Sequence, residues 1–300
     1  MNEKSFKKEV ALIRHVTLVG FWINAALVVL KLFFGYWGHS DALVADGYHS
    51  FSDFITDFIV IFFVATAYKK ADKEHPYGHG KYETFASLLI GVILFFVALY
   101  IGYEGSVKII SALNGEILVR PDVWTIVIAL VSILAKEYCY QYTIKNGKKI
   151  DSSALIANAH HHRSDAISSV ATLIGVSISF AFGEHWRILD PIASVVIAFF
   201  IAFSAFKIAH PAIDELLEIS IPQSQVNEII EAVKQIPGVK KIHNLRTRRN
   251  GHSMIMEMNI HVDPNITVQE GHIIATDVEH TLHKCFGSDV IIYIHVEPDD

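Results

Sequence analysis

Two short runs combine a histidine and an aspartate four residues apart at the start of long apolar segments. The first contains His49 and Asp53, and the second contains His161 and Asp165. In a helix, residues four positions apart share a face, so each pair would present one imidazole and one carboxylate together. Two such faces turned toward each other supply four ligands suited to a tetrahedral divalent ion such as zinc. The spacing therefore predicts one metal site shared by two helices.

The second run contains three consecutive histidines, and spacing selects among them. His161 precedes Asp165 by four residues, which is the spacing of the first pair, whereas His160 and His162 precede it by five and three. His161 is therefore the predicted ligand. Asp57 lies one turn beyond the first pair, where it is predicted either to relay protons or to face another helix.

The elements that must position these pairs are membrane spans. A chain that is 52% hydrophobic and 19% charged is too apolar for an ordinary soluble enzyme. Six stretches approach the roughly 20 residues needed to cross a bilayer; they are residues 16–37, 42–68, 85–105, 123–142, 154–182 and 191–209. The second and fifth contain the His/Asp pairs. Ionisable residues inside a membrane are costly and usually functional.

An interhelical hydrogen bond is the alternative explanation for one such pair. Two pairs on two spans favour a shared cation instead, because Arg163 is the only basic residue near them in the sequence.

Basic residues are concentrated on alternate connections between the spans. They are Lys4, Lys7, Lys8 and Arg14, then Lys69, Lys70, Lys73 and Lys81, then Lys145, Lys148 and Lys149, whereas the other connections carry Arg120 and Arg187. By the positive-inside rule, both termini are predicted to be cytoplasmic. We expect no removable signal peptide, because the apolar run after the polar start is too long and lacks a small-residue cleavage site.

From about residue 211 the pattern changes to that of a soluble domain. Helices are predicted at 222–235 and 267–285, and strands at 239–248, 254–262 and 290–296, with Asn250-Gly251 as a hairpin turn. This order predicts a small ferredoxin-like α+β unit. Residues 211–300 carry 14 acidic and 7 basic residues, which argues against a nucleic-acid partner. The chain is thus predicted to comprise a six-helix transmembrane domain (1–210) and a cytoplasmic α+β domain (211–300).

A second candidate cluster lies in the connection after the second span. Asp72, His75 and His79 have compact ligand spacing, and Gly78 and Gly80 would let the backbone fold round an ion. An ordinary solvated loop is the alternative.

The C-terminal domain supplies a third candidate set, in which strand ends and a helix converge. Its members are His243, His261, His272, His295 and Glu297. The alternative is ordinary exposed histidine, since His252, His280 and His283 show that histidine is common in this region.

These motifs together resemble the cation diffusion facilitator family. The resemblance rests on the first span pair, the His-Pro-Tyr-Gly-His-Gly-Lys loop, the Ala-His-His-His-Arg-Ser-Asp-Ala run and the layout of six spans plus a tail, and covers nearly the whole chain. It implies a homodimeric exporter of divalent metal in the cytoplasmic membrane, driven by proton antiport, and not an enzyme. The family's transport, loop and tail sites fall on the three sets named above.

The resemblance also bears on the metal. His-x-x-x-Asp on both spans resembles the zinc type, whereas Asp or Tyr at the position of His49 resembles manganese or iron carriers. Zn²⁺ is therefore the expected cargo and the ion expected for a structural or regulatory site in the tail, with Fe²⁺, Mn²⁺, Cd²⁺ and Co²⁺ as alternatives to it as cargo. Asn259 stands where some members have histidine, and Glu297 where some have aspartate. One tail ion is thus expected to be weak or missing.

Two other functions are alternatives to metal export, and one ion pair between the protomers is also predicted. A metal-gated channel would share the intramembrane site without proton coupling. An intramembrane metallohydrolase would need an open metal position and a base, and the sequence has no His-Glu-x-x-His. Lys81 is predicted to pair across the dimer with Asp214 or Glu218.

Overall fold

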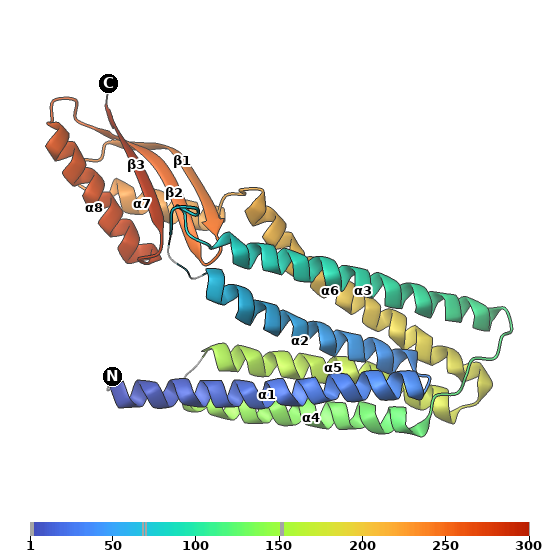
Figure 1. Ribbon diagram of the computed structural model, residues 1–300. Helices are drawn as coiled ribbons and strands as arrows, with labels where there is room; N and C mark the ends of the chain where they lie inside the picture. Colours follow the sequence, from blue (N-terminus) through green and yellow to red (C-terminus); the bar gives the residue numbers. More distant parts are fainter. Residues whose placement is uncertain (1–2, 68, 70, 151–152, 300) are drawn as a thin grey trace. The chain divides into compact units, whose positions relative to one another are not determined.

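The computed structural model describes residues 3–67, 69, 71–150 and 153–299. Its first part is helical (Figure 1): α1 (Glu3–Trp37), α2 (Asp41–Ala67), α3 (Lys81–Leu113), α4 (Val123–Lys149), α5 (Ser153–Ala181), the short 3₁₀ helix η1 (Glu184–Ile188) and α6 (Leu189–Leu216). Lys70 and the side chain of Asp57 lie outside the described part.

The predicted spans fall on these helices. Within the described residues, five helical stretches are long and apolar enough to cross a membrane; they are His15–Trp37, Lys81–Leu113, Val123–Lys149, Asn158–Ala181 and Glu184–Leu216. The remaining predicted span, the second along the chain, falls on α2, a helix of 27 residues. The helical membrane fold is therefore confirmed.

Local signals set several helix starts. Ser40 Oγ accepts a hydrogen bond from the Leu43 N–H at 3.1 Å at the start of α2, and Asp122 accepts one from the Trp124 N–H at 2.9 Å at the start of α4. Such side chains satisfy the N–H groups that a helix leaves unpaired in its first turn.

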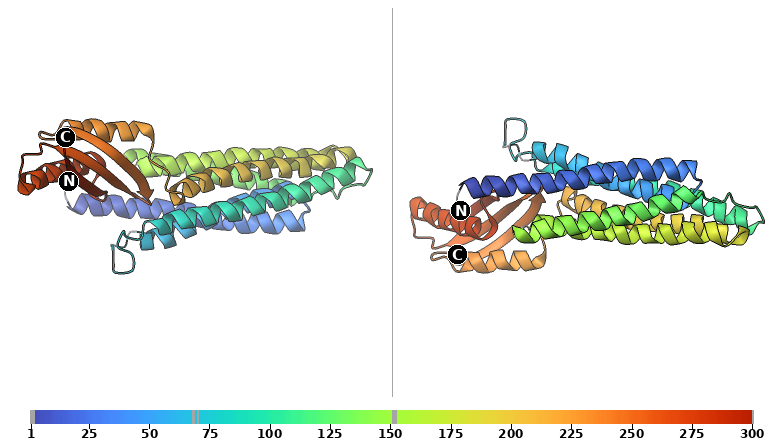
Figure 2. Two further views of the ribbon diagram at one scale, coloured as in Figure 1. Left: turned by 90° about the horizontal axis from the view of Figure 1, so that it is seen from above. Right: turned by 90° about the horizontal axis from the view of Figure 1, so that it is seen from below.

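The helices approach one another closely at small residues. The long helices α1 and α4 run lengthwise beside each other (Figure 2), and α4 packs against α5. A Cβ on Gly105 would lie 2.8 Å from Val195 of α6, and one on Gly175 would lie 2.6 Å from Ala193 of α6. Glycine at these positions lets α3 and α5 come close to α6, as is typical of helix contacts in membranes.

The C-terminal part is a three-stranded sheet covered by two helices (Figure 1). It contains α7 (Gln223–Lys234), β1 (Lys241–Asn250), β2 (Ser253–Val262), α8 (Val268–Phe286) and β3 (Ile291–Pro298). The strand order is β1-β2-β3, with β1 and β2 antiparallel and β2 and β3 parallel. The α-β-β-α-β order and the small α+β fold are confirmed.

Alternation along β2 separates the two faces of this sheet. Met256, Met258 and Ile260 are buried in a core with Ile229 of α7 and Leu282 of α8. The odd-numbered residues of β2 therefore point to the face that these helices do not cover.

The chain divides into two compact units. The first comprises residues 1–58 and 90–207, and the second comprises residues 59–89 and 208–300. The second unit thus contains the α2–α3 connection as well as the sheet.

Candidate metal sites

The first unit brings together three of the four predicted transport ligands. Ligand atoms of His49, Asp53 and Asp165 all lie within 4.8 Å of one another. His49 and Asp53 stand one turn apart on α2, and Asp165 projects from α5. Asp53 Oδ2 is buried and has no hydrogen-bond partner among the described atoms. A buried carboxylate oxygen without a donor is costly in a membrane and is suited to receiving a cation.

The fourth predicted ligand lies beside this cluster. His161 Nδ1 is 3.8 Å from Asp165 Oδ1, and its side chain is 54% exposed. His160 is also exposed, with its ring centroid 6.0 Å from that of Tyr140. His162 is buried, and neither of its ring nitrogens has a hydrogen-bond partner in the described part of the chain. The ring that faces Asp165 is thus that of His161, the histidine selected by spacing.

Two buried lysines form ion pairs that the sequence did not predict. Lys136 of α4 donates a hydrogen bond to Asp165 Oδ2 at 2.7 Å, and its side chain is 1% exposed. Lys31 of α1 lies 2.9 Å from Asp46 Oδ2, with both side chains buried. The sequence did contain a signal for both pairs, because Lys31 and Lys136 are each the one lysine inside a predicted apolar span.

The hydroxyls of Ser132 and Ser169 lie between the two ion pairs. Ser169, one turn after Asp165 on α5, lies 3.5 Å from Ser132, one turn before Lys136 on α4. Ser169 Oγ also donates to Asp46, at 3.0 Å to Oδ2. The two lysines, two aspartates and two serines thus form a buried polar core between four helices.

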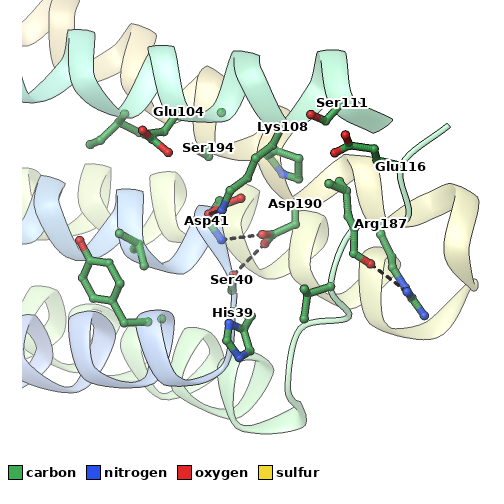
Figure 3. A pocket seen from close by; sticks show the side chains of 18 of the residues that line it. His39, Ser40, Asp41, Glu104, Lys108, Ser111, Glu116, Arg187, Asp190 and Ser194 are labelled. Carbon is green, nitrogen blue, oxygen red and sulfur yellow. Dashed lines mark hydrogen bonds and ion pairs between the residues drawn. The ribbon is translucent and has the colours of Figure 1, made fainter. Parts of the chain in front are cut away.

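A cavity of about 370 Å³ lies in the first unit near the starts of α2 and α6 (Figure 3). Asp190 is buried there and accepts hydrogen bonds from Ser40 Oγ at 2.7 Å and the Asp41 N–H at 2.6 Å. Lys108 of α3 contacts Asp41 Oδ1 at 2.5 Å. These contacts hold the first turn of α2 in place, roughly two turns before His49.

The second unit brings the three predicted loop ligands together. Ligand atoms of Asp72, His75 and His79 lie within 4.8 Å of one another. Asp72 Oδ1 accepts hydrogen bonds from the His75 N–H at 2.8 Å and the Glu74 N–H at 2.9 Å. The first of these is the main reason that the pKa of Asp72 lies below its ordinary value.

Both glycines of this loop are required by its geometry. Gly78 has a φ of +81°, a conformation that side chains with a Cβ rarely adopt. A Cβ on Gly80 would overlap the carbonyl oxygen of Asn250 in the β1–β2 turn. The Asn250 amide donates to the Tyr77 carbonyl at 2.9 Å, so the loop is held against the hairpin.

Lys81, which follows the loop, pairs within its own chain. Its ammonium lies 3.4 Å from Glu218 Oε1 and donates to the Glu215 carbonyl at 2.7 Å. Glu218 is one of the two partners predicted for Lys81, and the contact links the start of α3 to the end of α6.

The sheet brings together four of the five predicted tail ligands on its helix-free face. Strand register explains why, because His243 is paired with Asn259, Asn259 with His295, and His261 with Glu297. His261 Nε2 lies 3.0 Å from His243 Nδ1, and Glu297 Oε2 lies 3.3 Å from His243 Nε2. His295 Nε2 lies 3.5 Å from Glu297 Oε1.

Asn259 and Asp299 also belong to this cluster. The Asn259 amide donates to Glu297 Oε1 at 2.7 Å. Asp299 Oδ1 lies 3.3 Å from His261 Nδ1, and a hydrogen bond from Lys241 is the main cause of its lowered pKa. A carboxylate on Nδ1 would orient the His261 ring so that Nε2 faces a metal.

The remaining predicted tail ligand lies apart from this cluster. His272 is exposed on α8, and α8 packs on the opposite face of the sheet. One chain therefore does not bring His272 to the other four residues.

Comparison with known proteins matches both parts of the chain to one family. Residues 17–217 match the cation efflux transmembrane domain, and residues 221–299 match the cation efflux protein cytoplasmic domain. The manganese efflux system protein MneP of Bacillus subtilis is 34% identical over 95% of this chain and 96% of its own length. The cation-efflux pump FieF of Klebsiella pneumoniae is 29% identical over 90% of this chain and 88% of its own length.

Among solved structures, a copper form of a MamM CTD variant is 28% identical to this chain. The match covers 26% of this chain and 98% of that structure's chain, with a TM-score of 0.25. The family matches extend across both units, and the membrane helices carry the His/Asp cluster that the motifs predicted. The chain is a multi-pass membrane protein of the cation diffusion facilitator family, whose function is the efflux of divalent metal cations.

Proposed function

We propose that this protein exports Zn²⁺ in exchange for protons at a site formed by His49, Asp53, His161 and Asp165. The observation that carries the proposal is the meeting of His49, Asp53 and Asp165 within 4.8 Å on two membrane helices. An imidazole beside two carboxylates suits a borderline ion, and a second imidazole from His161 would complete a tetrahedral set.

Exchange for protons follows from the chemistry of these ligands. A neutral imidazole binds metal through the lone pair that a proton occupies in imidazolium, so protons and metal compete for His49 and His161. The carboxylate of Asp53 has a buried oxygen with no donor among the described atoms. Protons and metal would compete for this oxygen in the same way. Protons arriving from the outer side would release the metal, and loss of those protons toward the cytoplasm would restore the site.

The arrangement in the cell is part of the proposal. We place the protein in the cytoplasmic membrane with both termini in the cytoplasm, because the basic residues are concentrated on alternate connections. Residues 1–210 would carry transport. Residues 211–300 would bind metal and join two copies, and the match to the cytoplasmic domain of cation efflux proteins at residues 221–299 supports this assignment.

We assign regulatory or delivery roles to the other two clusters. Asp72, His75 and His79 would hold one ion beside the β1–β2 turn. His243, His261, His295 and Glu297 would hold another on the sheet. His272 would have to reach a tail ion from a second copy of the chain, since it lies apart within one chain.

Mn²⁺ is the second candidate cargo, because MneP is a manganese efflux protein and is 34% identical over nearly the whole chain. Manganese prefers oxygen ligands, whereas imidazole is well suited to zinc. A site with two carboxylates and one or two imidazoles lies between these preferences, so the two ions must be compared directly.

The test is flux into proteoliposomes of purified full-length protein, with Zn²⁺ or Mn²⁺ outside and a pH gradient that is present or abolished. We expect zinc uptake that increases when the lumen is more acidic. Asp53→Ala should reduce it to the level of empty liposomes. Zinc flux that ignores the pH gradient would indicate a metal-gated channel, and faster Mn²⁺ flux would identify manganese as the cargo. Normal transport by Asp53→Ala would refute the assigned site.

A further inference from the structure

The Lys136 ammonium occupies a position that the ligand geometry alone does not explain. It donates to Asp165 Oδ2 at 2.7 Å, while Asp165 Oδ1 faces His161 at 3.8 Å. Lys136 is fully buried on α4, so its charge has no access to solvent. One oxygen of a proposed metal ligand is thus held by a cation that belongs to the protein.

The positive charge of Lys136 changes the net charge of the metal site. Asp53 and Asp165 together carry two negative charges, which a divalent ion would neutralise. With Lys136 present the site carries a net charge of about −1, and a bound divalent ion would bring it to about +1. In a membrane interior, an uncompensated positive charge is unfavourable and is weakly screened. The lysine therefore opposes retention of the ion.

The second buried lysine does not share this role. Lys31 lies 2.9 Å from Asp46 Oδ2 and donates to Ser50 at 3.0 Å and Ser169 at 3.2 Å. Its partner, Asp46, is not in the metal-ligand cluster. The Lys31–Asp46 pair is neutral as a whole, and it leaves the charge of the His49–Asp53–Asp165 cluster unchanged.

From these contacts we infer that Lys136 is a tethered cation that competes with the metal for Asp165 and weakens the site so that the ion can be released. This inference rests on the proposed function, because it assumes that Asp165 is a transport ligand. Lys136 acts through Asp165 and is a positioning residue. Its removal should tighten binding and slow release, whereas removal of a merely structural lysine would do neither.

The experiment measures zinc affinity and release in purified full-length protein at pH 7.5. A background of Asp72→Ala and His261→Ala removes one ligand from each of the other two clusters. Affinity is measured by competition with a fluorescent indicator, and release by stopped-flow addition of a chelator. Lys136→Met removes the charge with little change in length, Lys136→Arg keeps it, and Lys31→Met is the matched control for loss of a buried lysine.

We expect Lys136→Met to bind zinc at least about tenfold tighter and to release it at least about tenfold more slowly. Lys136→Arg and Lys31→Met should stay within about threefold of the background protein for both quantities. If Lys136→Met does not fold, Lys136→Gln makes the same test, because it keeps a donor for Asp165 and removes the charge. Unchanged or weaker binding in a folded, monodisperse neutral variant would overturn the inference.

Asp165→Asn separates this inference from the proposed function. If Asp165→Asn binds zinc as tightly as the background protein, Asp165 is not a ligand and the proposed site is wrong. If Asp165→Asn weakens binding while Lys136→Met leaves it unchanged, the site stands and only the role of Lys136 is wrong. In the double variant Asp165→Asn/Lys136→Met, the tighter zinc binding caused by Lys136→Met should disappear, because the carboxylate that Lys136 contacts is gone.

Discussion

Glu215, near the end of α6, accepts a 2.5 Å hydrogen bond from the Thr84 hydroxyl at the start of α3. The same oxygen accepts one from the Gly251 N–H at 2.7 Å, in the turn between β1 and β2. A single carboxylate therefore joins two helices to the hairpin within the second unit. Metal bound beside this hairpin, at the loop cluster, would stabilise the same contacts.

Glu215→Ala should loosen the hairpin turn. Loss of the acceptor leaves the Thr84 hydroxyl and the Gly251 N–H without it, at a cost of about 1–3 kcal/mol for each group that stays buried. We expect faster trypsin cleavage at Arg248 or Arg249, which lie at the end of β1 just before the turn. The control is Glu228→Ala, which removes an exposed carboxylate from α7. Equal cleavage rates for the two variants would contradict a role for Glu215 in holding the turn.

The register among the three consecutive histidines gives a second prediction. His161→Ala should weaken zinc binding at the transport site by at least about tenfold, whereas His160→Ala should leave it unchanged. The measurement is zinc competition in protein whose loop and tail clusters are disabled. The decisive comparison is His162→Ala. If this variant loses more affinity than His161→Ala, the buried ring of His162 rather than that of His161 turns to the metal.

The sequence predicted the helix faces better than the contacts between helices. His49 and Asp53 come together because four residues span about one helical turn, which spacing alone reveals. The pairing of Lys136 with Asp165 depends on how α4 docks against α5, and no local pattern encodes that docking. The hydrophobic runs also gave only the apolar centres of helices, so the predicted span 85–105 lies inside the longer α3, Lys81–Leu113.

The tail shows the same division. The hairpin at Asn250-Gly251 and the α-β-β-α-β order followed from turn chemistry and alternation. Alternation along β3 puts His295 and Glu297, two residues apart, on one face. The position of His272 did not follow, because the face of the sheet that α8 covers is decided by the packing of Val278 and Leu282 in the core. A helix residue therefore could not be assigned to a strand cluster from order alone.

Acidification should release metal from the loop cluster without breaking its turn. The pKa of Asp72 is lowered chiefly by the His75 N–H, so its stabilising effect on the turn is complete above the ordinary aspartate pKa of about 3.9 and is lost only as pH falls through the lowered value. Between pH 7 and 5 Asp72 stays ionised. Metal lost in this range would then be lost while the Asp72 carboxylate is still available, because protons compete with metal for imidazole lone pairs.

The check on the loop cluster is cadmium titration of full-length protein carrying Asp53→Ala and His261→Ala. We expect the affinity to fall at least about tenfold from pH 7 to pH 5. Hydrogen exchange at the Gly78 amide, which donates to the His75 carbonyl at 3.0 Å, should not change. Asp72→Asn should lose metal at both pH values. Faster exchange of the Gly78 amide at pH 5, after correction for the intrinsic rate, would show that the turn opens first.

Asn259 limits the tail cluster, and replacing it should strengthen metal binding there. Its amide nitrogen donates to Glu297 Oε1 at 2.7 Å, so the nitrogen occupies a carboxylate oxygen and has no free lone pair of its own for a metal. Asn259→His would release that oxygen and add an imidazole opposite His243 and His295. We expect the tail to bind zinc at least about tenfold tighter, or to bind one more ion per chain.

The measurement is zinc stoichiometry and affinity in full-length protein carrying Asp53→Ala and Asp72→Ala. Asn259→Ala is the matched control, because it frees Glu297 without adding a ligand. If the histidine and alanine variants bind equally, the gain comes from the freed carboxylate and the added imidazole does not reach the ion.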